Sequence, residues 1–516
     1  MTKIVRSFVE DRWVEGTERL PVVNPATEES IGEVGIGGVD LQGAFAHGRR
    51  NGVPALGKLS FAERGRLLQA ISKCWHGQRE ALLDLAVRAG GNTRSDAKFD
   101  VDGAIGTVAH YGKLGEKLGG QHWLADGEAE KLLGNPRFIG QHVWGPRQGL
   151  AVHINAFNFP AWGFGEKAAV ALLAGMPVLI KAAPSTAIVT EHMVDVLVQE
   201  NILPTGAVAF LPAGESEVLE PLGAQDVVAF TGSAATAAKV RAHARVLASG
   251  ARVNVEADSL NAAVLGPDVD RDSDTYGLLL RELTREMTQK AGQKCTALRR
   301  IFVPHALMDS VCEDLAEQLG GIKVGDPSLK EVDMGPLDSA EQLQRVRQGV
   351  AALAEQASFV LGDGQRCSGA GVGDGVGYFI APTLLRLDAS GDAGPVHQRE
   401  VFGPVATVIA YDGTPSTAAR QVALADGALV NAIYSDDQGF VQEAAHALAP
   451  FSGRIHLGMR KTAEQSASPG MVLPQLTHGG PGRAGAGTEL GGERGLQLYM
   501  QRTALQGYAP MIERLS

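Results

Sequence analysis

The feature that most constrains the fold is a strand–helix alternation that begins near residue 149. Four apolar runs of strand length, GLAVHINA, MPVLIKAA, AVAFLPA and DVVAFTG, start at residues 149, 176, 207 and 226. Helical patterns of apolar residues lie between them, most clearly in TAIVTEHMVDVLVQEN at 186–201. Continuously apolar strands that alternate with helices are typical of a parallel sheet covered on both faces. The alternation therefore predicts a doubly wound α/β region, which is a common setting for a dinucleotide.

The rest of the chain must contribute further folding units. At 516 residues the chain is too long for a single hydrophobic core. A helical pattern covers about residues 41–118, and residues 129–148 are typical of a polar strand pair. A second α/β segment extends from about residue 260 to 475, and LYMQRTALQGY at 498–508 is typical of an edge strand.

The composition argues against several classes of protein. The formal net charge of −11 disfavours nucleic acid as the main partner, because phosphate binding needs a basic face. The four cysteines include no CxxC pair, so neither a disulfide framework nor a metal site is predicted. The N-terminal residues carry charges throughout, and no apolar run is long enough for a membrane span. We therefore expect a cytoplasmic protein that acts on small molecules and binds no membrane.

Two short matches to the dinucleotide-binding glycine motif carry little weight. GPGRAG at 480–485 satisfies G-x-G-x-x-G, and GFGEKA at 163–168 satisfies its Ala variant. The first match has no strand–helix unit after it. The second lacks the acid that should follow about 20 residues later. Neither match therefore locates a cofactor.

Three residues could carry chemistry, and each has a plain structural alternative, which local sequence favours for Cys295 and Asn158. Cys295, in KAGQKCTALRR, has cations nearby that would favour a thiolate, yet most free cysteines are packing residues. Glu256 ends a strand-like run, where a carboxylate can face a ligand crevice or simply solvent. Asn158 follows an apolar strand, where its amide could donate to an oxyanion or form an Asn-Phe-Pro turn. Local sequence leaves all three open.

Together these residues belong to a set of motifs that resembles a known family. The six motifs are FNFP (157–160), LIKAAPST (179–186), FTGS (230–233), VEADSLN (255–261), GQKCTA (292–297) and EVFGPV (400–405). Their order and spacing resemble the NAD(P)-dependent aldehyde dehydrogenase superfamily, from about residue 10 to the end of the chain. The resemblance implies an α/β fold with a Rossmann-like cofactor domain at 1–128 and 149–258, an α/β catalytic domain at 259–475, and a small β oligomerisation arm with the C-terminal segment at 129–148 and 476–516.

The resemblance also implies a division of labour in the active site. Cys295 would add to an aldehyde to give a thiohemiacetal, with Asn158 and the Cys295 backbone N–H as the oxyanion hole. Hydride transfer would leave a thioester, and Glu256 would activate the water that hydrolyses it. Lys167 and Glu489 match the positions of a proton relay. The residues implied to bind the cofactor are Ile154, Asn155, Ala156, Phe157, Lys181, Ala183, Pro184, Ser185, Gly214, Phe230, Thr231, Gly232, Ser233, Ala257, Glu400 and Phe402.

Two departures from the family pattern carry information. NAD-preferring members often have an acid three residues after the ribose-binding lysine, and Pro184 takes that place after Lys181. Without the carboxylate nothing repels a 2′-phosphate, and the hydroxyls of Ser185 and Thr186 could bind it, so we expect NADP in preference to NAD. The usual E-L-G-G is Glu256-Ala-Asp-Ser here, which retains the base but alters the backbone expected beside the nicotinamide.

Finer motifs point to a subfamily. EADSLN, LPQLTHGGPGRAG and YMQRTALQG resemble the dehydrogenase half of the bifunctional ring-opening enzyme of bacterial phenylacetate degradation, and the stand-alone 3,4-dehydroadipyl-CoA semialdehyde dehydrogenases of benzoate degradation. The substrate is therefore expected to be an aldehyde linked to CoA. His478 and Arg483 are candidates for the substrate entrance, although a structural turn would account for both more simply. Gly292 is expected to allow close approach of the nicotinamide or the aldehyde.

Other activities remain open at this point. A CoA-acylating dehydrogenase would resolve the thioester with free CoA, but such relatives generally lack the acid at the position of Glu256. A thiol esterase would use the same Cys, Asn and Glu without redox chemistry. The substrate could also be another semialdehyde, such as the one derived from oxepin-CoA in the phenylacetate pathway. The family likeness further implies a homodimer joined through residues 129–148 and 498–508.

Overall fold

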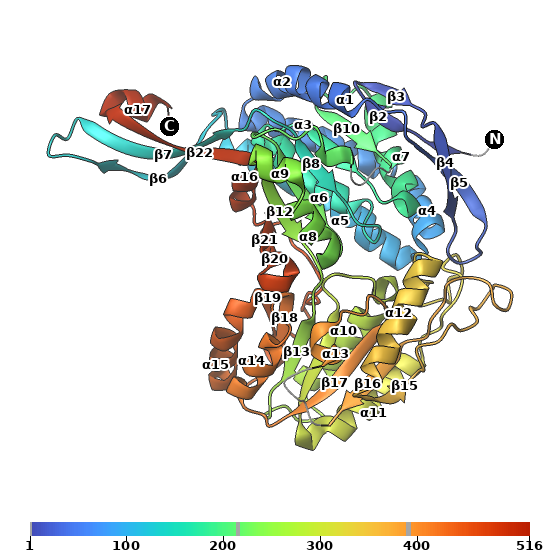
Figure 1. Ribbon diagram of the computed structural model, residues 1–516. Helices are drawn as coiled ribbons and strands as arrows, with labels where there is room; N and C mark the ends of the chain where they lie inside the picture. Colours follow the sequence, from blue (N-terminus) through green and yellow to red (C-terminus); the bar gives the residue numbers. More distant parts are fainter. Residues whose placement is uncertain (1–2, 213–216, 389–393, 516) are drawn as a thin grey trace.

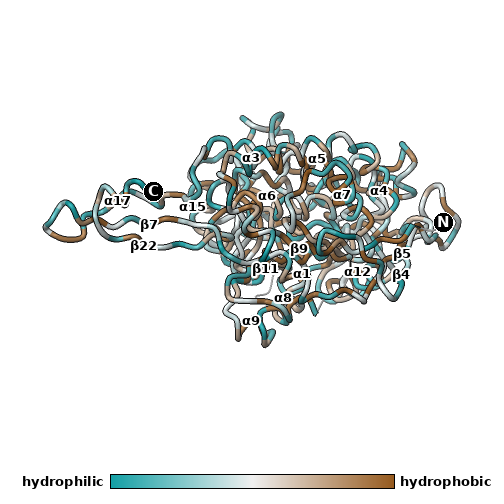
Figure 2. Tube along the Cα trace, turned by 90° about the horizontal axis from the view of Figure 1, so that it is seen from above, coloured by the Kyte–Doolittle hydropathy of each residue, from teal (hydrophilic) through white to brown (hydrophobic). Residues whose placement is uncertain are grey.

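Two large sheets covered by helices make up the body of the protein, and a small sheet forms an arm that projects from it (Figure 1). The computed structural model describes residues 3–212, 217–388 and 394–515. Figure 2, seen from above, shows the same arm standing clear of the body. Both large sheets have seven strands and are mostly parallel. The protein therefore has the α/β architecture that the strand–helix alternation predicts.

The first large sheet contains the four apolar runs of the sequence as parallel neighbours. Its strand order is β12-β11-β8-β9-β10-β2-β3, with only β2 and β3 antiparallel to their neighbours. The register aligns Ile154 with Lys181 and Thr231 with Glu256, so these strands end at one edge. The strands are β2 (Ser7–Val9), β3 (Arg12–Val14), β8 (Ala151–Ile154), β9 (Val178–Lys181), β10 (Val208–Leu211), β11 (Val227–Thr231) and β12 (Arg252–Glu256).

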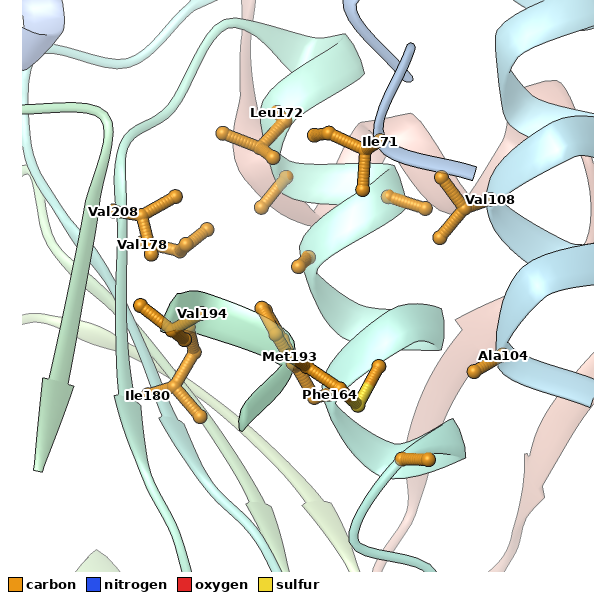
Figure 3. Close-up of a cluster of buried hydrophobic side chains, with 14 of the residues drawn as sticks. Ile71, Ala104, Val108, Phe164, Leu172, Val178, Ile180, Met193, Val194 and Val208 are labelled. Atoms are coloured by element: carbon orange, nitrogen blue, oxygen red, sulfur yellow. The ribbon is translucent and has the colours of Figure 1, made fainter. Parts of the chain in front are cut away.

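Helix α6 (Trp162–Ala174) is the central helix that packs on this sheet. Its side chains are apolar on almost every side, so the helix is buried between the sheet and its neighbouring helices. Figure 3 shows Phe164 and Leu172 of α6 together with Val178 of β9 and Val108 of α5. Burial of each large side chain of this kind stabilises the fold by about 1.5–3 kcal/mol. The other helices here are α1 (Leu41–His47), α2 (Val53–Gly57), α3 (Phe61–Gly77), α4 (Arg79–Gly90), α5 (Arg94–Leu118), α7 (Ala187–Gln199), α8 (Ala234–Arg241) and α9 (Ala244–Ser249).

The second large sheet forms within the predicted α/β segment after residue 260. Its order is β15-β16-β17-β14-β13-β18-β19, and only β15 is antiparallel to its neighbour. The strands are β13 (Asn261–Leu265), β14 (Leu298–Pro304), β15 (Ser358–Leu361), β16 (Thr383–Leu387), β17 (Val405–Tyr411), β18 (Ala428–Tyr434) and β19 (Ser452–Gly458). The helices are α10 (Asp274–Thr288), α11 (Met308–Gly320), α12 (Ala340–Leu353), α13 (Pro395–Gln398), α14 (Pro415–Ala423) and α15 (Gln438–Leu448).

The C-terminal segment links these units to each other and to the arm. The hairpin of β20 (Thr477–Gly480) and β21 (Gly487–Leu490) contacts β12 of the first sheet and β19 of the second. After α16 (Glu493–Tyr499), the strand β22 (Met500–Tyr508) joins β7 (Phe138–Pro146) and β6 (Leu124–Lys131) in the arm, and α17 (Ala509–Leu515) follows. A third small sheet contains β1 (Ile4–Val5), β4 (Glu18–Val23) and β5 (Ser30–Ile36). Among the described residues, no helix has the length and apolar character needed to cross a membrane.

Candidate active site

A cavity of about 500 Å³ lies at the carboxyl ends of the parallel strands of the first sheet, and residues of the second unit close it. The ends of parallel strands meet at one edge, which is why residues from distant motifs line the same wall. Eighteen of the residues singled out in the sequence line it: Ile154, Asn155, Ala156, Phe157, Asn158, Lys167, Lys181, Ala183, Phe230, Thr231, Gly232, Ser233, Glu256, Ala257, Cys295, Glu400, Phe402 and His478.

A few predicted site residues lie elsewhere. Pro184, Ser185 and Arg483 do not line the cavity, and Glu489 lies behind the wall next to Lys167. Arg483 is part of a short 3₁₀ turn, η8 (Gly482–Ala484), as expected if THGGPGR is structural there. Gly214 is outside the residues that the structure describes.

The segment before Cys295 has an unusual backbone that a glycine makes possible. The three residues from Lys290 to Gly292 have φ values of 56°, 52° and 68°. A Cβ atom on Gly292 would lie 2.2 Å from the carbonyl oxygen of Gly403. Glycine is therefore required here by contact with the protein's own backbone, which corrects the expectation that it makes room for the nicotinamide or the aldehyde. Asn261 Nδ2 donates to the Cys295 carbonyl at 2.8 Å and fixes the position of the cysteine.

The cations near Cys295 have other partners. Lys294 Nζ lies 2.8 Å from Glu286 Oε2. Arg299 donates to the carbonyl oxygens of Gly292 and Gly403 at 2.7 and 2.6 Å. Burial raises the pKa of the Cys295 thiol well above its ordinary value, and the charge of Glu256 raises it further. The neighbouring cations therefore do not hold the thiol as a thiolate.

Asn158 is held beside the cysteine by a direct hydrogen bond. It follows β8 and precedes α6, and its side chain is buried in the cavity wall. Its Nδ2 donates to the carbonyl oxygen of Gln293, two residues before Cys295, at 3.0 Å. An amide nitrogen carries two protons, so the second remains able to donate to an oxygen above the thiol. This position suits an oxyanion donor.

Glu256 is a buried carboxylate that faces both Cys295 and His478. A carboxylate oxygen of Glu256, the sulfur of Cys295 and a ring nitrogen of His478 all lie within 4.8 Å of one another. His478 Nε2 is 3.3 Å from Glu256 Oε2. Burial alone would raise the pKa of Glu256, but the charge and hydrogen bond of His478, with a smaller effect of Lys167, lower it to about 2. Glu256 is therefore ionised throughout the neutral range.

Lys167 joins the base to two further carboxylates. Its Nζ lies 3.2 Å from Glu489 Oε2 and 3.2 Å from Glu166 Oε1. Burial raises the pKa of Glu489 to about 7, against the opposing charge of Lys167. Oxygen atoms of Glu166, Glu256 and Glu489 lie within 4.8 Å of one another. The predicted relay residues thus form a continuous buried cluster behind the base, and Glu166 is a member that the sequence motifs did not single out.

The position of His478 differs from the sequence expectation. We expected it at the substrate entrance or in a turn, and it lies in β20 with 2% of its surface exposed, against the base. The register of the hairpin places His478 opposite Glu489, so both side chains leave the same face toward Glu256. No local sequence signal reports this contact, because it depends on how the hairpin docks on β12.

The other half of the cavity fits the predicted dinucleotide. Both side-chain amide atoms of Asn155, the Thr231 hydroxyl and Glu400 Oε1 are buried without a hydrogen-bond partner in the described part of the chain. An unsatisfied buried polar group costs about 1–3 kcal/mol, so such a group is expected to meet a polar ligand or water. Ser233 caps the N-terminus of α8, which opens onto the same space. These polar groups suit the hydroxyl, amide and phosphate groups of a dinucleotide.

The residues expected to bind a 2′-phosphate have internal contacts. Thr186 Oγ1 donates to the Phe157 carbonyl at 3.1 Å. The Ser185 hydroxyl hydrogen-bonds with Asp338. The expectation of NADP therefore depends on Lys181, which lines the cavity at the end of β9, and on the lack of a carboxylate at Pro184.

Comparison with known proteins identifies relatives over almost the whole chain. The model of the Aldehyde dehydrogenase family matches residues 13–505. The chain is 40% identical over 479 residues to 3,4-dehydroadipyl-CoA semialdehyde dehydrogenase of Aromatoleum evansii, covering 92% of each chain. It is 27% identical over 445 residues to lactaldehyde dehydrogenase of Escherichia coli, covering 85% of this chain and 86% of the relative. A crystal structure of a betaine aldehyde dehydrogenase mutant of Staphylococcus aureus, in complex with NAD⁺, matches with a TM-score of 0.85 at 24% identity, covering 98% of this chain and 97% of that one. The structural match confirms the predicted fold.

Proposed function

Because the chain belongs to the aldehyde dehydrogenase family, we propose that it oxidises a CoA-linked semialdehyde to the acid with NADP as the preferred cofactor. The coarser activity is established: the protein is an NAD(P)-dependent aldehyde dehydrogenase. The substrate we propose is 3,4-dehydroadipyl-CoA semialdehyde, an intermediate of benzoate degradation. The observation that carries this choice is the 40% identity to the Aromatoleum evansii enzyme of that name.

Cys295 begins the reaction as the nucleophile. Its sulfur, as thiolate, forms a bond with the aldehyde carbon, and the π electrons of the carbonyl pass to its oxygen, which becomes an oxyanion. The second proton of Asn158 Nδ2 and the Cys295 backbone N–H stabilise that oxyanion. The hydrogen bond from Asn158 to Gln293, at 3.0 Å, keeps the donor in place before the substrate arrives.

The cofactor half of the cavity completes the oxidation. When bound, the oxidised cofactor supplies a positively charged nicotinamide ring that favours the Cys295 thiolate and accepts the hydride from the aldehyde carbon. The buried polar atoms of Asn155, Thr231 and Glu400 would form hydrogen bonds with the bound cofactor. Lys181 would lie toward the adenosine ribose of the cofactor. The product of this step is a thioester on Cys295.

Glu256 promotes hydrolysis of the thioester. It accepts a proton from water as the water oxygen bonds to the thioester carbon, and the carbon–sulfur bond then breaks to release the acid. Its position near the sulfur of Cys295 supports water rather than free CoA as the acceptor. A thiol esterase would use the same hydrolytic step, but it would leave the cofactor half without a role.

We also propose a homodimer that forms through the arm. Large apolar side chains are exposed there, including Leu133 at 66%, Tyr508 at 58% and Met511 at 57%. Clustered exposed apolar side chains often mark a protein interface. Light scattering should report twice the mass of 54.1 kDa, and a monomer at all concentrations would contradict the assignment.

A panel of aldehydes with matched cofactors tests the proposed substrate. The panel contains the CoA-linked C6 semialdehyde, the same aldehyde without CoA, and an oxepin-CoA-derived semialdehyde, each assayed with NADP and NAD. We expect the highest kcat/KM for the first compound with NADP. An equal kcat/KM without the CoA group would overturn the CoA-linked substrate, and higher activity with NAD would overturn the cofactor preference. If the protein hydrolyses an ester and reduces no cofactor with any aldehyde, the esterase is favoured.

A further inference from the structure

His478 is a buried histidine whose imidazole has one contact and one unused nitrogen. Its Nε2 is 3.3 Å from Glu256 Oε2. Its Nδ1 and the other Glu256 oxygen, Oε1, are both buried and without a hydrogen-bond partner in the described ranges. Both side chains line the cavity. A buried acid–base pair that has unused hydrogen-bonding atoms and whose residues line a cavity is well placed to take a proton from a group bound there.

The hairpin that carries His478 is closely packed. A Cβ atom on the next residue, Gly479, would lie 2.1 Å from the carbonyl oxygen of Gly487 across the hairpin. The two strands therefore approach too closely for a larger residue at that position. Close packing therefore fixes the backbone that carries His478, and the contact with Glu256 holds the imidazole.

Glu256 is a weak base while His478 is protonated. Against the effect of burial, the charge and hydrogen bond of protonated His478, with a smaller effect of Lys167, hold the pKa of Glu256 at about 2. A general base works best when its pKa is near the operating pH, and the charge effect of His478 is lost when the imidazole is neutral. The same contact raises the pKa of His478 above its ordinary value, although burial opposes this. The other titratable groups around the pair are Lys167 and Glu166 of α6, Glu489 of β21, Cys295 and Arg454 of β19. Of the two paired groups, the imidazole is the one whose ordinary pKa lies nearest to neutrality.

We propose that His478 is a positioning residue that, as neutral imidazole, receives through Nε2 the proton that Glu256 removes from the hydrolytic water. This inference rests on the proposed function, because it assigns a step in the hydrolysis of the Cys295 thioester. The water O–H bond breaks as its oxygen bonds to the thioester carbon. The proton passes to Glu256 and on to His478, and the carbon–sulfur bond breaks to give the acid and the Cys295 thiolate.

Stopped-flow kinetics of the full-length His478→Gln variant test the proposal. Glutamine places a hydrogen-bonding nitrogen near Glu256 but cannot take a proton. The variant should keep the first-turnover burst of reduced cofactor, since hydride transfer precedes the step. Its steady-state rate should fall roughly 100-fold, within the range of general acid–base catalysis. Wild-type steady-state turnover should rise with pH as His478 loses its proton and becomes neutral. The variant should lack this rise.

Two matched variants separate the role of His478 from that of a neighbouring acid and from the loss of any histidine paired with a glutamate. Glu489 also titrates near neutrality, so Glu489→Gln should slow turnover but keep the rise with pH. His456 is half-buried and lies 3.1 Å from Glu282, and neither residue lines the cavity, so His456→Gln should leave burst, rate and pH profile unchanged.

The outcomes that would overturn the proposal are distinct from those that affect the proposed function. A His478→Gln variant with wild-type rate and the wild-type rise with pH would show a purely structural role. Loss of the burst in a variant that melts at the wild-type temperature would place His478 before hydride transfer and would also overturn it. A wild-type enzyme that gives no burst with any aldehyde would instead remove the proposed function, and this inference with it.

Discussion

Two histidine–glutamate pairs among the described residues have similar geometry and different surroundings. His456 lies 3.1 Å from Glu282, and His478 lies 3.3 Å from Glu256. Glu282 also accepts hydrogen bonds from the hydroxyls of Tyr434 at 2.6 Å and Ser466 at 2.8 Å, so both of its oxygens are used.

At the second pair, one oxygen of Glu256 and one nitrogen of His478 have no hydrogen-bond partner within the described residues, and both residues line the cavity. A saturated pair stabilises the fold, whereas a pair with unused atoms toward a cavity is available for chemistry. The difference between these two regions shows that the residue types alone do not identify a base. The surrounding hydrogen bonds do.

The largest difference that we expect between the two pairs is in the kinetics of Glu256→Gln and Glu282→Gln. Glu256→Gln should keep the burst of one reduced cofactor per chain but lower steady-state turnover about 10²- to 10⁴-fold, because the thioester loses its general base. Glu282→Gln should leave the burst and the steady-state turnover within about twofold of wild type, because the Glu282 carboxylate makes contacts within the fold and takes no part in catalysis. Stopped-flow absorbance of the reduced cofactor measures both. Equal losses in the two variants, or normal turnover of Glu256→Gln, would contradict the distinction.

The free energy of unfolding should fall more in Glu282→Gln than in Glu256→Gln, and this difference should be smaller than the kinetic one. Glu282→Gln weakens three contacts, those from His456, Tyr434 and Ser466, and we expect a loss of about 1–3 kcal/mol in the free energy of unfolding. Glu256→Gln removes a buried charge with fewer hydrogen bonds, so it should lose less. Urea unfolding of the two variants provides the measurement. A larger loss for Glu256→Gln would mean that its pair is structural as well.

The smallest expected effect is the pH dependence of that stability. Burial would raise the pKa of Glu282, but its hydrogen bonds and the charge of His456 lower it below the ordinary value. A lowered pKa in the folded state contributes stability above the unfolded pKa of about 4.3, and that contribution is lost as pH falls through the folded pKa. The difference in melting temperature between wild type and Glu282→Gln should therefore stay nearly constant from pH 7 to about pH 5 and narrow as the pH falls below about 4.3. A constant difference would show that the carboxylate charge does not matter there.

Much of the site followed from patterns that are local in the sequence. The apolar runs before Asn158 and up to Glu256 predicted parallel strands, and parallel strands bring their carboxyl ends to one edge. The motif around Cys295 supplied the third member from the second unit.

The remaining features depend on contacts that no local pattern records. His478 reaches Glu256 only through the register of β20 with β21, and THGGPGR by itself resembles a turn. Gly292 is required by the backbone of Gly403, which lies far along the chain. Ser185 turns to Asp338 of another unit rather than to the cavity. Each of these needs the packed structure, because burial and docking decide which partner a side chain finds.

The central claim is that Cys295 forms a thioester which Glu256 helps to hydrolyse, and one measurement tests it directly. Glu256→Gln protein is incubated with the aldehyde and NADP, quenched in acid, digested and analysed by mass spectrometry. We expect one acyl group per chain on the peptide that contains Cys295, in an amount equal to the reduced cofactor formed. Reduced cofactor without an acyl group on that peptide, or an acyl group on Cys74, Cys312 or Cys367 instead, would contradict it.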